Sequence, residues 1–379
     1  MRIGLNAAFL GKGHNGISTY TRGLIKALGE HGSSDGQEYV VYTSSEDDVP
    51  REPNFKWRRT LPFLRAEHGA FGNSLRLLWT QSVLPRLLLN DRVDVLLSPL
   101  PESPIFSKTP RVVVVHDLIP FFYPEESPRL ALYSRSVLPL SLRRAGGIVA
   151  DSEHTKQDLI REFGIDGRRV SVAYLGVDDC YFSRNGLASA PSGCPDEYFL
   201  FVGACVPRKN PLGVVRAYAE IHERIAHKLV LVTSTGSYPN EVKRVVADLG
   251  LSDKVKFYSA LPQHQMLFLY RRATALVFLS EYEGFGYPVA EAMAAGTPAI
   301  VCAGTSLPEV VGDAGVVVSP GDSGGVARAM IELALDKPAR ELLRERGLLH
   351  RKMFQWPVVA EKLGSVLLTA INGNSRIDL

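Results

Sequence analysis

The chain alternates short apolar runs with longer segments whose apolar residues recur at helical spacing. The run Val112–Val115 is apolar throughout, which is typical of a strand buried on both faces of a sheet. The segment Ile17–Leu28 instead places its apolar residues on one face of a helix. Strands that alternate with helices in this way imply right-handed crossovers and parallel sheets.

Two series of such elements follow one another along the chain. The predicted strands are Ile3–Leu5, Tyr39–Tyr42, Val93–Leu97, Val112–Val115 and Ile148–Ala150, then Phe199–Val202, Leu229–Val232, Val255–Tyr258, Ala275–Leu279, Ala299–Val301 and Val316–Val318. The predicted helices are Ile17–Leu28, a helix capped by Ser152 that runs to Phe163, Leu212–Arg224, Asn240–Leu249, Gln263–Arg271, Pro288–Ala295 and Gly325–Leu335.

The break between the two series lies at Asn185–Pro195, a segment rich in glycine, serine and proline and therefore typical of a linker. The pattern predicts two doubly wound α/β domains, over residues 1–184 and 196–355. Residues 356–379 include Trp356–Ile371, which is apolar at helical spacing and could pack on either domain.

Composition and charge narrow the class of protein. The chain has 379 residues, of which 45% are apolar and 22% charged, and its net charge is +3. This excludes a disordered or fibrous chain, and no overall basic field favours nucleic-acid binding. Neither a signal peptide nor an apolar stretch of membrane-spanning length is visible, and the four cysteines show no metal or disulfide spacing. We therefore expect a soluble, cytoplasmic protein.

Two motifs follow strands of the first series. Gly11-Lys12-Gly13-His14-Asn15-Gly16 matches the glycine pattern of dinucleotide-binding loops, but five residues separate it from the first strand and no acidic residue ends the second. It predicts either an ordinary turn or a flexible anion-binding loop ahead of a helix. His116-Asp117 ends a buried strand, where His116 could exchange a proton with a substrate hydroxyl or form a structural His–Asp hydrogen bond.

Two further motifs follow strands of the second series. Pro207-Arg208-Lys209-Asn210-Pro211 places two cations at a helix start, where they suit phosphate oxygens or form a solvated turn. In Glu283-Gly284-Phe285-Gly286-Tyr287-Pro288, two glycines expose backbone N–H groups before a helix that carries Glu291. Both carboxylates could reach one crevice and accept vicinal hydroxyls of a nucleotide-sugar, or they could simply cap the helix.

Together these motifs resemble the family-4 retaining glycosyltransferases of the GT-B fold. The signature E-x(7)-E runs from Glu283 to Glu291. The other matching segments are Gly16-Ile17-x-x-Tyr20, Val149-Ala150-Asp151-Ser152, Leu175-Gly176-Val177-Asp178, Pro207–Pro211, Ala295-Gly296-Thr297-Pro298 and Ser306–Gly315. Because motifs fall in both halves, the resemblance covers nearly the whole chain. It implies two Rossmann-like domains that face a central cleft, and a terminal helix that crosses back to the first domain.

The resemblance also implies residue roles. Arg208 and Lys209 would hold the donor diphosphate, Glu291 the ribose hydroxyls, and Glu283 the donor sugar near C3 and C4. Gly16 would let the N-terminal loop close over the phosphates, and His116 would line the sugar pocket near C6. The expected catalytic residues are Glu283, His116, Arg208 and Lys209, and the expected donor-binding residues are Gly16, Gly203, Arg208, Lys209, Tyr258, Ser259, Glu283, Gly284, Phe285, Gly286, Tyr287 and Glu291. Ser259 departs from the glycine that the family often has there, which leaves recognition of the base open.

The pattern His116-Asp117-Leu118-x-Pro120 looks most like bacterial mannosyl- and rhamnosyltransferases that build polysaccharides. The favoured donor is GDP-mannose, with dTDP-rhamnose or a UDP-sugar as alternatives, and the acceptor would be a saccharide or a lipid-linked saccharide. No cofactor or metal is expected, because cations and helix N-termini can stabilise the leaving diphosphate and Asp178-Asp179 resembles a metal-binding pair only superficially. An NAD-dependent oxidoreductase, a nucleotide-sugar hydrolase or epimerase, and a non-enzymatic nucleotide-sugar binder are the rival functions.

A membrane contact is a further expectation. Residues 51–90 carry seven basic and two acidic residues, with Leu75, Leu78, Trp79 and Leu87 among them. Such a surface suits docking on the anionic inner face of a membrane that holds a lipid-linked acceptor. The alternative is an ordinary core helix with solvated arginines.

Overall fold

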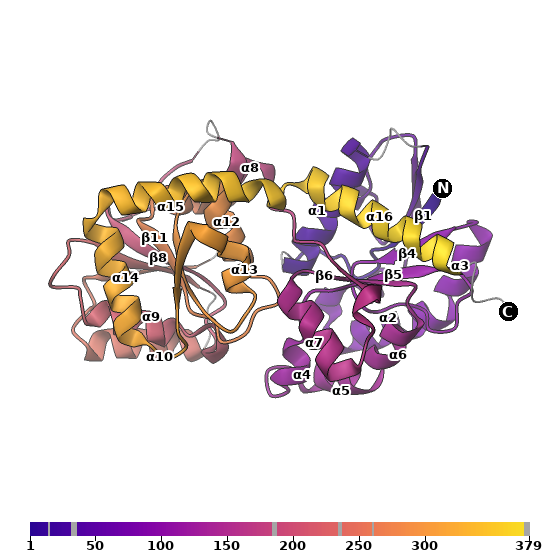
Figure 1. Ribbon diagram of the computed structural model, residues 1–379. Coiled ribbons are helices and arrows are strands. Elements are labelled where there is room, and N and C mark those ends of the chain that lie inside the picture. The colour runs from indigo at the N-terminus through magenta and orange to yellow at the C-terminus, as the bar shows by residue number, and fades with distance from the viewer. Residues whose placement is uncertain (14–15, 32–35, 184–187, 234–236, 260, 375–379) are drawn as a thin grey trace. The chain divides into compact units, whose positions relative to one another are not determined.

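The computed structural model describes residues 1–13, 16–31, 36–183, 188–233, 237–259 and 261–374 (Figure 1). The chain forms two compact units, Met1–Gly176 with Trp356–Leu379, and Val177–Gln355. Each unit contains one sheet in which every strand pair is parallel. Residues 177–183 group with the second unit, whereas residues 184–187 of the predicted boundary region lie outside the described residues.

The first unit is built on a seven-stranded sheet of order β3-β2-β1-β4-β5-β6-β7. Its strands are β1 Arg2–Asn6, β2 Glu38–Thr43, β3 Phe55–Arg59, β4 Val95–Ser98, β5 Arg111–Val115, β6 Gly147–Ala150 and β7 Val170–Val172. The strand order reverses beside β1, which is the doubly wound arrangement that the sequence predicts. The central strands β4, β5 and β6 are buried along their whole length, as their uninterrupted apolar runs require.

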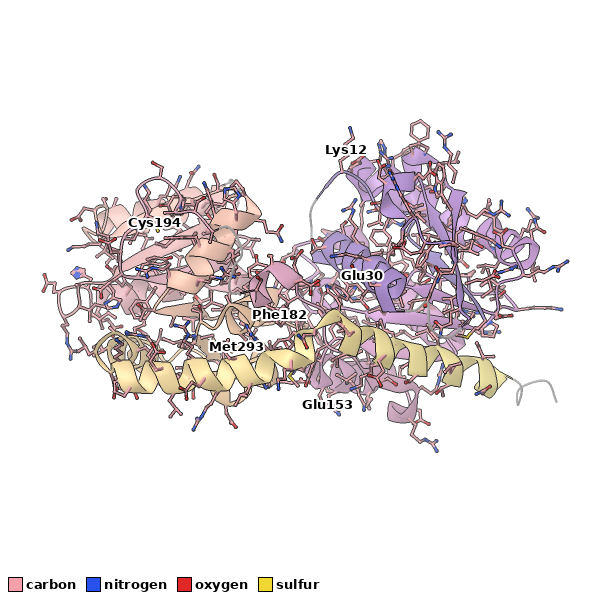
Figure 2. The ribbon with its side chains drawn as sticks, turned by 90° about the horizontal axis from the view of Figure 1, so that it is seen from above. Lys12, Glu30, Glu153, Phe182, Cys194 and Met293 are labelled. Carbon is pink, nitrogen blue, oxygen red and sulfur yellow. The ribbon has the colours of Figure 1, made fainter. Side chains whose placement is uncertain are left out.

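Helices pack against this sheet. They are α1 Gly16–His31, α2 Gly69–Ser82, α3 Leu84–Asn90, α4 Ile119–Phe122, α5 Pro128–Ser136, α6 Leu138–Arg144, α7 Glu153–Phe163 and α16 Trp356–Asn374. Ser152 caps α7 as predicted, because its side chain accepts a hydrogen bond from the Thr155 N–H at 3.0 Å. Helix α16 lies beside α1, which carries the labelled Glu30, and contacts β4, β5 and β6 (Figure 2).

Trp356 anchors the start of α16 in the first unit. Its ring lies so close to Gly23 and Gly176 that a Cβ atom on either glycine would overlap the indole. The ring of Tyr20 packs against the same indole, with centroids 5.8 Å apart. The two glycines therefore provide the space into which the tryptophan fits.

The second unit has a six-stranded sheet of order β10-β9-β8-β11-β12-β13. Its strands are β8 Tyr198–Gly203, β9 Lys228–Thr233, β10 Val255–Tyr258, β11 Ala275–Phe278, β12 Ala299–Cys302 and β13 Gly315–Val318. Its helices are α8 Asp179–Phe182, α9 Pro211–Ala219, α10 Ser237–Asp248, α11 Gln263–Arg272, α12 Tyr287–Ala295, α13 Leu307–Val311, α14 Ser323–Leu335 and α15 Lys337–His350. The order again reverses, between β8 and β11, so ligands are expected at the carboxyl ends of these two strands.

Every predicted strand is present, with shifts of one or two residues at some ends. The predicted helix Leu212–Arg224 is too long, because α9 ends at Ala219 and a series of turns follows. The sequence interpretation missed β3, β7 and several helices, including α5, α6 and α15, and it gave a core helix within residues 51–90 only as an alternative. None of the helices in the described ranges is both long and apolar enough to span a membrane.

Candidate functional site

In the second unit, the segments that follow β8 and β11 bring two cations to one carboxylate. Arg208 Nη1 lies 3.4 Å and Lys209 Nζ 3.2 Å from Glu283 Oε1. Ser280 Oγ donates to the same oxygen at 2.8 Å. Arg208 and Glu283 are both buried, so their charges interact with little screening by water. If the Glu283 carboxylate turned to another partner, the charges of Arg208 and Lys209 would form a positively charged site.

Local backbone geometry places these two cations. After Gly203 the chain enters the short 3-10 helix Pro207–Lys209, and Asn210 then caps α9 by accepting from the Gly213 N–H at 3.0 Å. A Cβ atom on Gly203 would lie 3.2 Å from Lys209 Cδ, so glycine allows the lysine to pass close to the strand end. The Arg208 carbonyl also accepts from the Glu281 N–H at 2.8 Å, which ties the two segments together.

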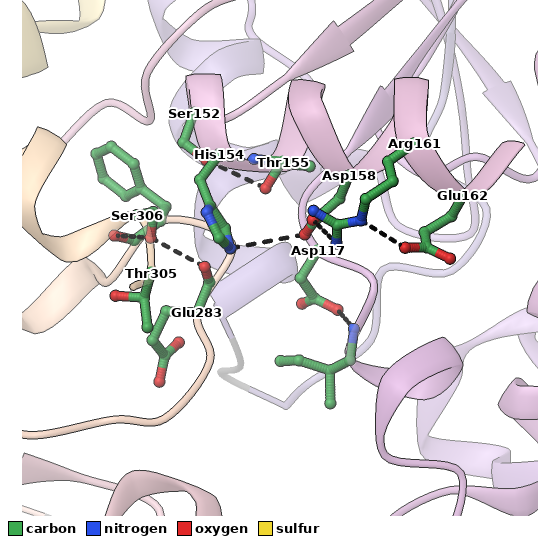
Figure 3. Close-up of polar contacts among 12 residues, drawn as sticks. Asp117, Ser152, His154, Thr155, Asp158, Arg161, Glu162, Glu283, Thr305 and Ser306 are labelled. Carbon is green, nitrogen blue, oxygen red and sulfur yellow. Dashed lines mark hydrogen bonds and ion pairs between the residues drawn. The ribbon is translucent and has the colours of Figure 1, made fainter. Parts of the chain in front are cut away.

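The glycine-containing loop that follows Glu283 is held from α13. Ser306 is fully buried, and its hydroxyl lies 2.9 Å from the Glu283 carbonyl and 3.0 Å from that of Phe285 (Figure 3). Gly286 has a φ of +99°, and a Cβ atom there would overlap Leu307 Cδ2. The ring of Phe285 is buried against Phe354, with centroids 5.7 Å apart. The ring of Phe285 therefore belongs to the core, and Ser306 fixes the backbone of the loop from the side of α13.

Glu291 lies in the second turn of α12, which begins at Tyr287, next to Gly286 and close to Gly284. Its Oε2 accepts a hydrogen bond from the Tyr270 hydroxyl at 2.7 Å. Burial raises the pKa of Glu291 to about 7, the Tyr270 hydrogen bond opposes this rise, and the charge of Asp178 adds to it. The carboxylate therefore changes charge near neutral pH.

Two of the predicted donor-binding residues lie at the edge of the six-stranded sheet. Tyr258 is the last residue of the edge strand β10 and Ser259 follows it, and β9 separates this strand from β8. The Tyr258 hydroxyl donates to the Ser192 carbonyl at 3.1 Å. Their expected contact with a donor base stays a prediction.

His116, in the first unit, is bound through both ring nitrogens. Nδ1 lies 2.6 Å from Asp151 Oδ2, and Nε2 lies 2.9 Å from the Pro99 carbonyl. The structural His–Asp hydrogen bond, one of the two alternatives that the sequence left open, is therefore made with Asp151. The carboxylate of the adjacent Asp117 accepts from the Ile119 N–H at 2.9 Å (Figure 3). Burial lowers the pKa of His116, but the charge and hydrogen bond of Asp151 outweigh it, so the pKa is raised overall. With an acceptor at each nitrogen, the geometry favours the imidazolium.

The glycine-rich loop of the first unit is described only in part. Gly16 begins α1, whereas His14 and Asn15 lie outside the described residues.

Asp158 on α7 is a buried carboxylate that the sequence reasoning did not single out. Arg161 Nη2 lies 2.6 Å from it, and His154 Nε2 lies 3.6 Å from it (Figure 3).

The basic stretch 51–90 divides between core and surface. Arg76 is buried and forms a two-pronged ion pair with Glu102, at 2.6 and 2.8 Å, and Trp79 is buried as well. These two residues therefore belong to the core rather than to a docking surface. In contrast, a set of apolar side chains on the same stretch is exposed, namely Leu61, Phe63, Phe71, Leu78 and Leu89.

The Asp178-Asp179 pair lies at the start of α8 in the second unit. Asp178 caps α8, where its Oδ1 accepts from the Cys180 N–H at 2.9 Å. Among the residues that the structure describes, no group of three or more His, Cys, Asp and Glu side chains is arranged to hold a metal ion.

Sequence reasoning missed three residues that shape the candidate site. Asp151 and Ser306 lie inside segments that match the family, so the resemblance pointed to these positions, but it did not predict their contacts with His116 and with the loop after Glu283. Tyr270 lies in the apolar pattern of a helix, where nothing distinguishes it from a core residue.

Comparisons with known proteins agree on one group. The family described as "Glycosyl transferases group 1" matches residues 189–350, and "Glycosyltransferase Family 4" matches residues 14–180. O-antigen chain mannosyltransferase B of Escherichia coli is 31% identical over 254 residues, 65% of this chain and 66% of that protein. O-antigen chain mannosyltransferase RfbU of Salmonella typhimurium is 31% identical over 212 residues, 56% of this chain and 57% of that protein. The matches thus span somewhat under two thirds of these relatives.

The fold has solved counterparts. The structure of Anabaena Alr3699/HepE in complex with UDP and glucose aligns with a TM-score of 0.71 at 17% identity, over 97% of this chain and 99% of that one. The two parallel sheets of the present structure are therefore those of the GT-B architecture, as the sequence predicts.

Proposed function

Since this chain belongs to the family-4 retaining glycosyltransferases, we propose that it transfers a hexose from a nucleotide-sugar to a saccharide or lipid-linked saccharide acceptor. The observation that carries the proposal is the group formed by Arg208, Lys209 and Glu283 at the carboxyl ends of β8 and β11. Glu291 follows on α12. The group combines cations for a diphosphate with carboxylates for sugar hydroxyls.

Donor binding would exchange partners within this group. The diphosphate would take Arg208 and Lys209, and Glu283 would turn from them to hydroxyls of the donor sugar. Glu291 would accept the ribose hydroxyls. Each charge that loses its partner gains another from the ligand, which avoids the cost of an isolated buried charge. Gly16 and His116 are assigned to the phosphates and to the sugar pocket by the family resemblance.

The chemical step would proceed with retention. The bond between the anomeric carbon and the diphosphate oxygen breaks while the acceptor hydroxyl attacks from the same face. The hydroxyl proton passes to the departing diphosphate. Arg208 and Lys209 stabilise the charge that develops on this leaving group, which is the main electrostatic demand of the reaction. No metal enters this scheme, so EDTA should leave transfer unchanged, and activity restored only by Mg²⁺ or Mn²⁺ would overturn that part.

GDP-mannose is the proposed donor. It is supported by similarity to two proteins named as O-antigen mannosyltransferases, whereas the UDP complex of a protein with the same fold makes a UDP-sugar the first alternative. The test is mass spectrometry of products after incubation with GDP-mannose, dTDP-rhamnose or UDP-glucose and a panel of saccharide and lipid-linked acceptors. We expect a hexose added from GDP-mannose.

The same screen, together with a fluorescence titration with NADH, separates the rival functions. Sugar release that needs no acceptor would indicate a hydrolase, and saturable NADH binding by fluorescence would indicate an oxidoreductase. Turnover of dTDP-rhamnose or UDP-glucose alone would replace the donor while keeping the enzyme class. Failure of all three donors to bind would contradict the proposal itself.

We also propose that the first unit contacts an anionic membrane surface through α2, α3 and the turns before α2. Phe63 is 58% exposed and Phe71 65% exposed, and residues 68–90 contain no acidic side chain. Exposed aromatic residues beside basic ones suit an anionic leaflet.

Co-sedimentation with vesicles that contain phosphatidylglycerol should exceed that with phosphatidylcholine alone, and Phe71→Ser should reduce it. Leu335→Ser, at an equally exposed position of the second unit, is the control. Equal binding to both vesicle types would refute the contact.

A further inference from the structure

We propose that Tyr270 is a positioning residue for donor binding, which fixes Glu291 so that ribose hydroxyls meet a carboxylate of defined orientation. This inference rests on the proposed function, because it assigns Glu291 to the ribose. It adds a residue that neither the sequence motifs nor the family resemblance singled out.

Tyr270 is held firmly from several directions. It is fully buried near the end of α11, and its hydroxyl donates to Glu291 Oε2 at 2.7 Å. Its backbone carbonyl accepts a hydrogen bond from the Thr297 hydroxyl, just beyond α12. Its ring stands edge-on to that of Tyr181 on α8, with centroids 5.6 Å apart. A side chain fixed in this way orients the carboxylate before any ligand arrives.

The hydrogen bond from Tyr270 gives the two carboxylate oxygens of Glu291 different roles. Glu291 remains partly exposed, so a ligand can reach its carboxylate. Since Oε2 already accepts the bond from Tyr270, Oε1 keeps the larger share of the acceptor positions for the ribose hydroxyls. The expectation that Glu291 holds vicinal hydroxyls equally with both oxygens is thereby refined, because Oε2 also anchors the carboxylate to Tyr270.

The bond also supports the ionised form of Glu291. The titratable groups that interact with this carboxylate are Asp178, Cys180 and Tyr181 at α8, and Tyr270 on α11. Arg271 of α11 instead donates to the carbonyls of Cys180 and Ser183. Burial and the charge of Asp178 raise the pKa of Glu291, and the hydrogen bond from the Tyr270 hydroxyl lowers it. Removing that hydroxyl must therefore raise the pKa further.

Tyr270→Phe tests this directly. Calorimetric binding of GDP-mannose and, in parallel, UDP-glucose is measured without acceptor at several pH values between about 6 and 9. Both ligands carry ribose, and their esterified diphosphates lack the phosphate proton that titrates near pH 6 in a free phosphate monoester. In the wild type, affinity should rise as Glu291 ionises.

In the variant, the midpoint of this rise should move to higher pH. If the hydrogen bond shifts the pKa by about one unit, affinity at pH 7 should fall roughly fivefold and recover towards pH 9. Because the anchor acts on binding, KM for the donor should change more than kcat. Binding of inorganic pyrophosphate, which has no ribose, should be equal in the two proteins at each pH.

Tyr218→Phe is the matched control for fold stability. Tyr218 is also a buried tyrosine of the second unit, and its hydroxyl donates to the His227 carbonyl at 2.9 Å. This variant loses a comparable buried hydrogen bond on α9 and should keep the wild-type pH profile. A shift of the midpoint in both variants would show a general effect of destabilisation and would overturn the assignment to Tyr270.

Glu291→Gln separates this inference from the proposed function. It should bind the donor weakly and without the pH-dependent rise. If it binds like the wild type, the assignment of Glu291 to ribose is wrong. If it binds weakly but Tyr270→Phe keeps the wild-type midpoint and affinity, the ribose assignment stands and the role of Tyr270 is refuted.

Discussion

Gly286→Ala probes how tightly α13 holds the loop between Glu283 and α12. Gly286 has a φ of +99°, a conformation that costs an L-residue about 1–2 kcal/mol. The added methyl group would also overlap the side chain of Leu307, which is fully buried. Overpacking of this kind costs about 1–3 kcal/mol. The two effects together should lower the free energy of unfolding of the second unit by about 2–5 kcal/mol.

Gly304→Ala separates the two effects. Gly304 has a φ of +82°, but no heavy atom lies within 4 Å of the position of its Cβ, so only the backbone cost applies. Urea unfolding of the full chain should therefore show a loss of about 1–2 kcal/mol for Gly304→Ala. Equal losses for the two variants would refute the close contact between Gly286 and Leu307.

The same variant has a functional consequence. A displaced loop moves the backbone that the donor is proposed to meet, so GDP-mannose should bind less tightly to Gly286→Ala than to Gly304→Ala. Adding Leu307→Ala to Gly286→Ala should cost less than the sum of the single changes, because the space then exists for the methyl group. Strict additivity would show that the two side chains do not interact.

Three further predictions follow from other contacts. Glu291 has a folded pKa of about 7, above its ordinary value of 4.5, so the folded state holds its proton to higher pH and wild-type stability should fall between about pH 4.5 and pH 7. Relative to Glu291→Gln the fall should be about 2–3 kcal/mol in urea unfolding, and parallel pH profiles would contradict it. Asp151→Asn should lower the pKa of His116 in an NMR titration, because the charge that raises it is gone; an unchanged value would exclude this pairing. Gly23→Ala should cost about 2 kcal/mol or more and shift the fluorescence of Trp356, whose ring fills that space, and wild-type spectra and stability would refute the packing.

The apolar pattern was sufficient to predict the buried strands but not the edge strands β3 and β7. Central strands such as β5 are apolar along their whole length, so their pattern is unambiguous. Edge strand β3 has the sequence Phe-Lys-Trp-Arg-Arg and buries mainly its first residue, which makes it look like a polar loop. Edge strand β7 has only three residues. Such strands depend on pairing with a neighbour, which local sequence does not reveal.

The candidate site was predictable where its chemistry is local in sequence. Arg208, Lys209 and Glu283 each follow a strand, and the adjacency of β8 and β11 brings them together as expected. The partner of His116 was not predictable in this way, because the adjacent Asp117 points to a backbone N–H and Asp151 arrives from the neighbouring strand. Side-chain pairs across strands depend on sheet order, and that order appears only in the folded structure.

The central claim is that the cations after β8 bind the donor diphosphate. Calorimetric titration of GDP-mannose into the wild type, Arg208→Ala and Arg216→Ala tests it most directly, since Arg216 is an exposed arginine on the next helix of the same unit. Loss of a hydrogen bond to a charged group is worth about 1.5–3 kcal/mol, so Arg208→Ala should bind at least about tenfold more weakly while Arg216→Ala binds normally. Unchanged affinity in a folded Arg208→Ala protein would contradict the account.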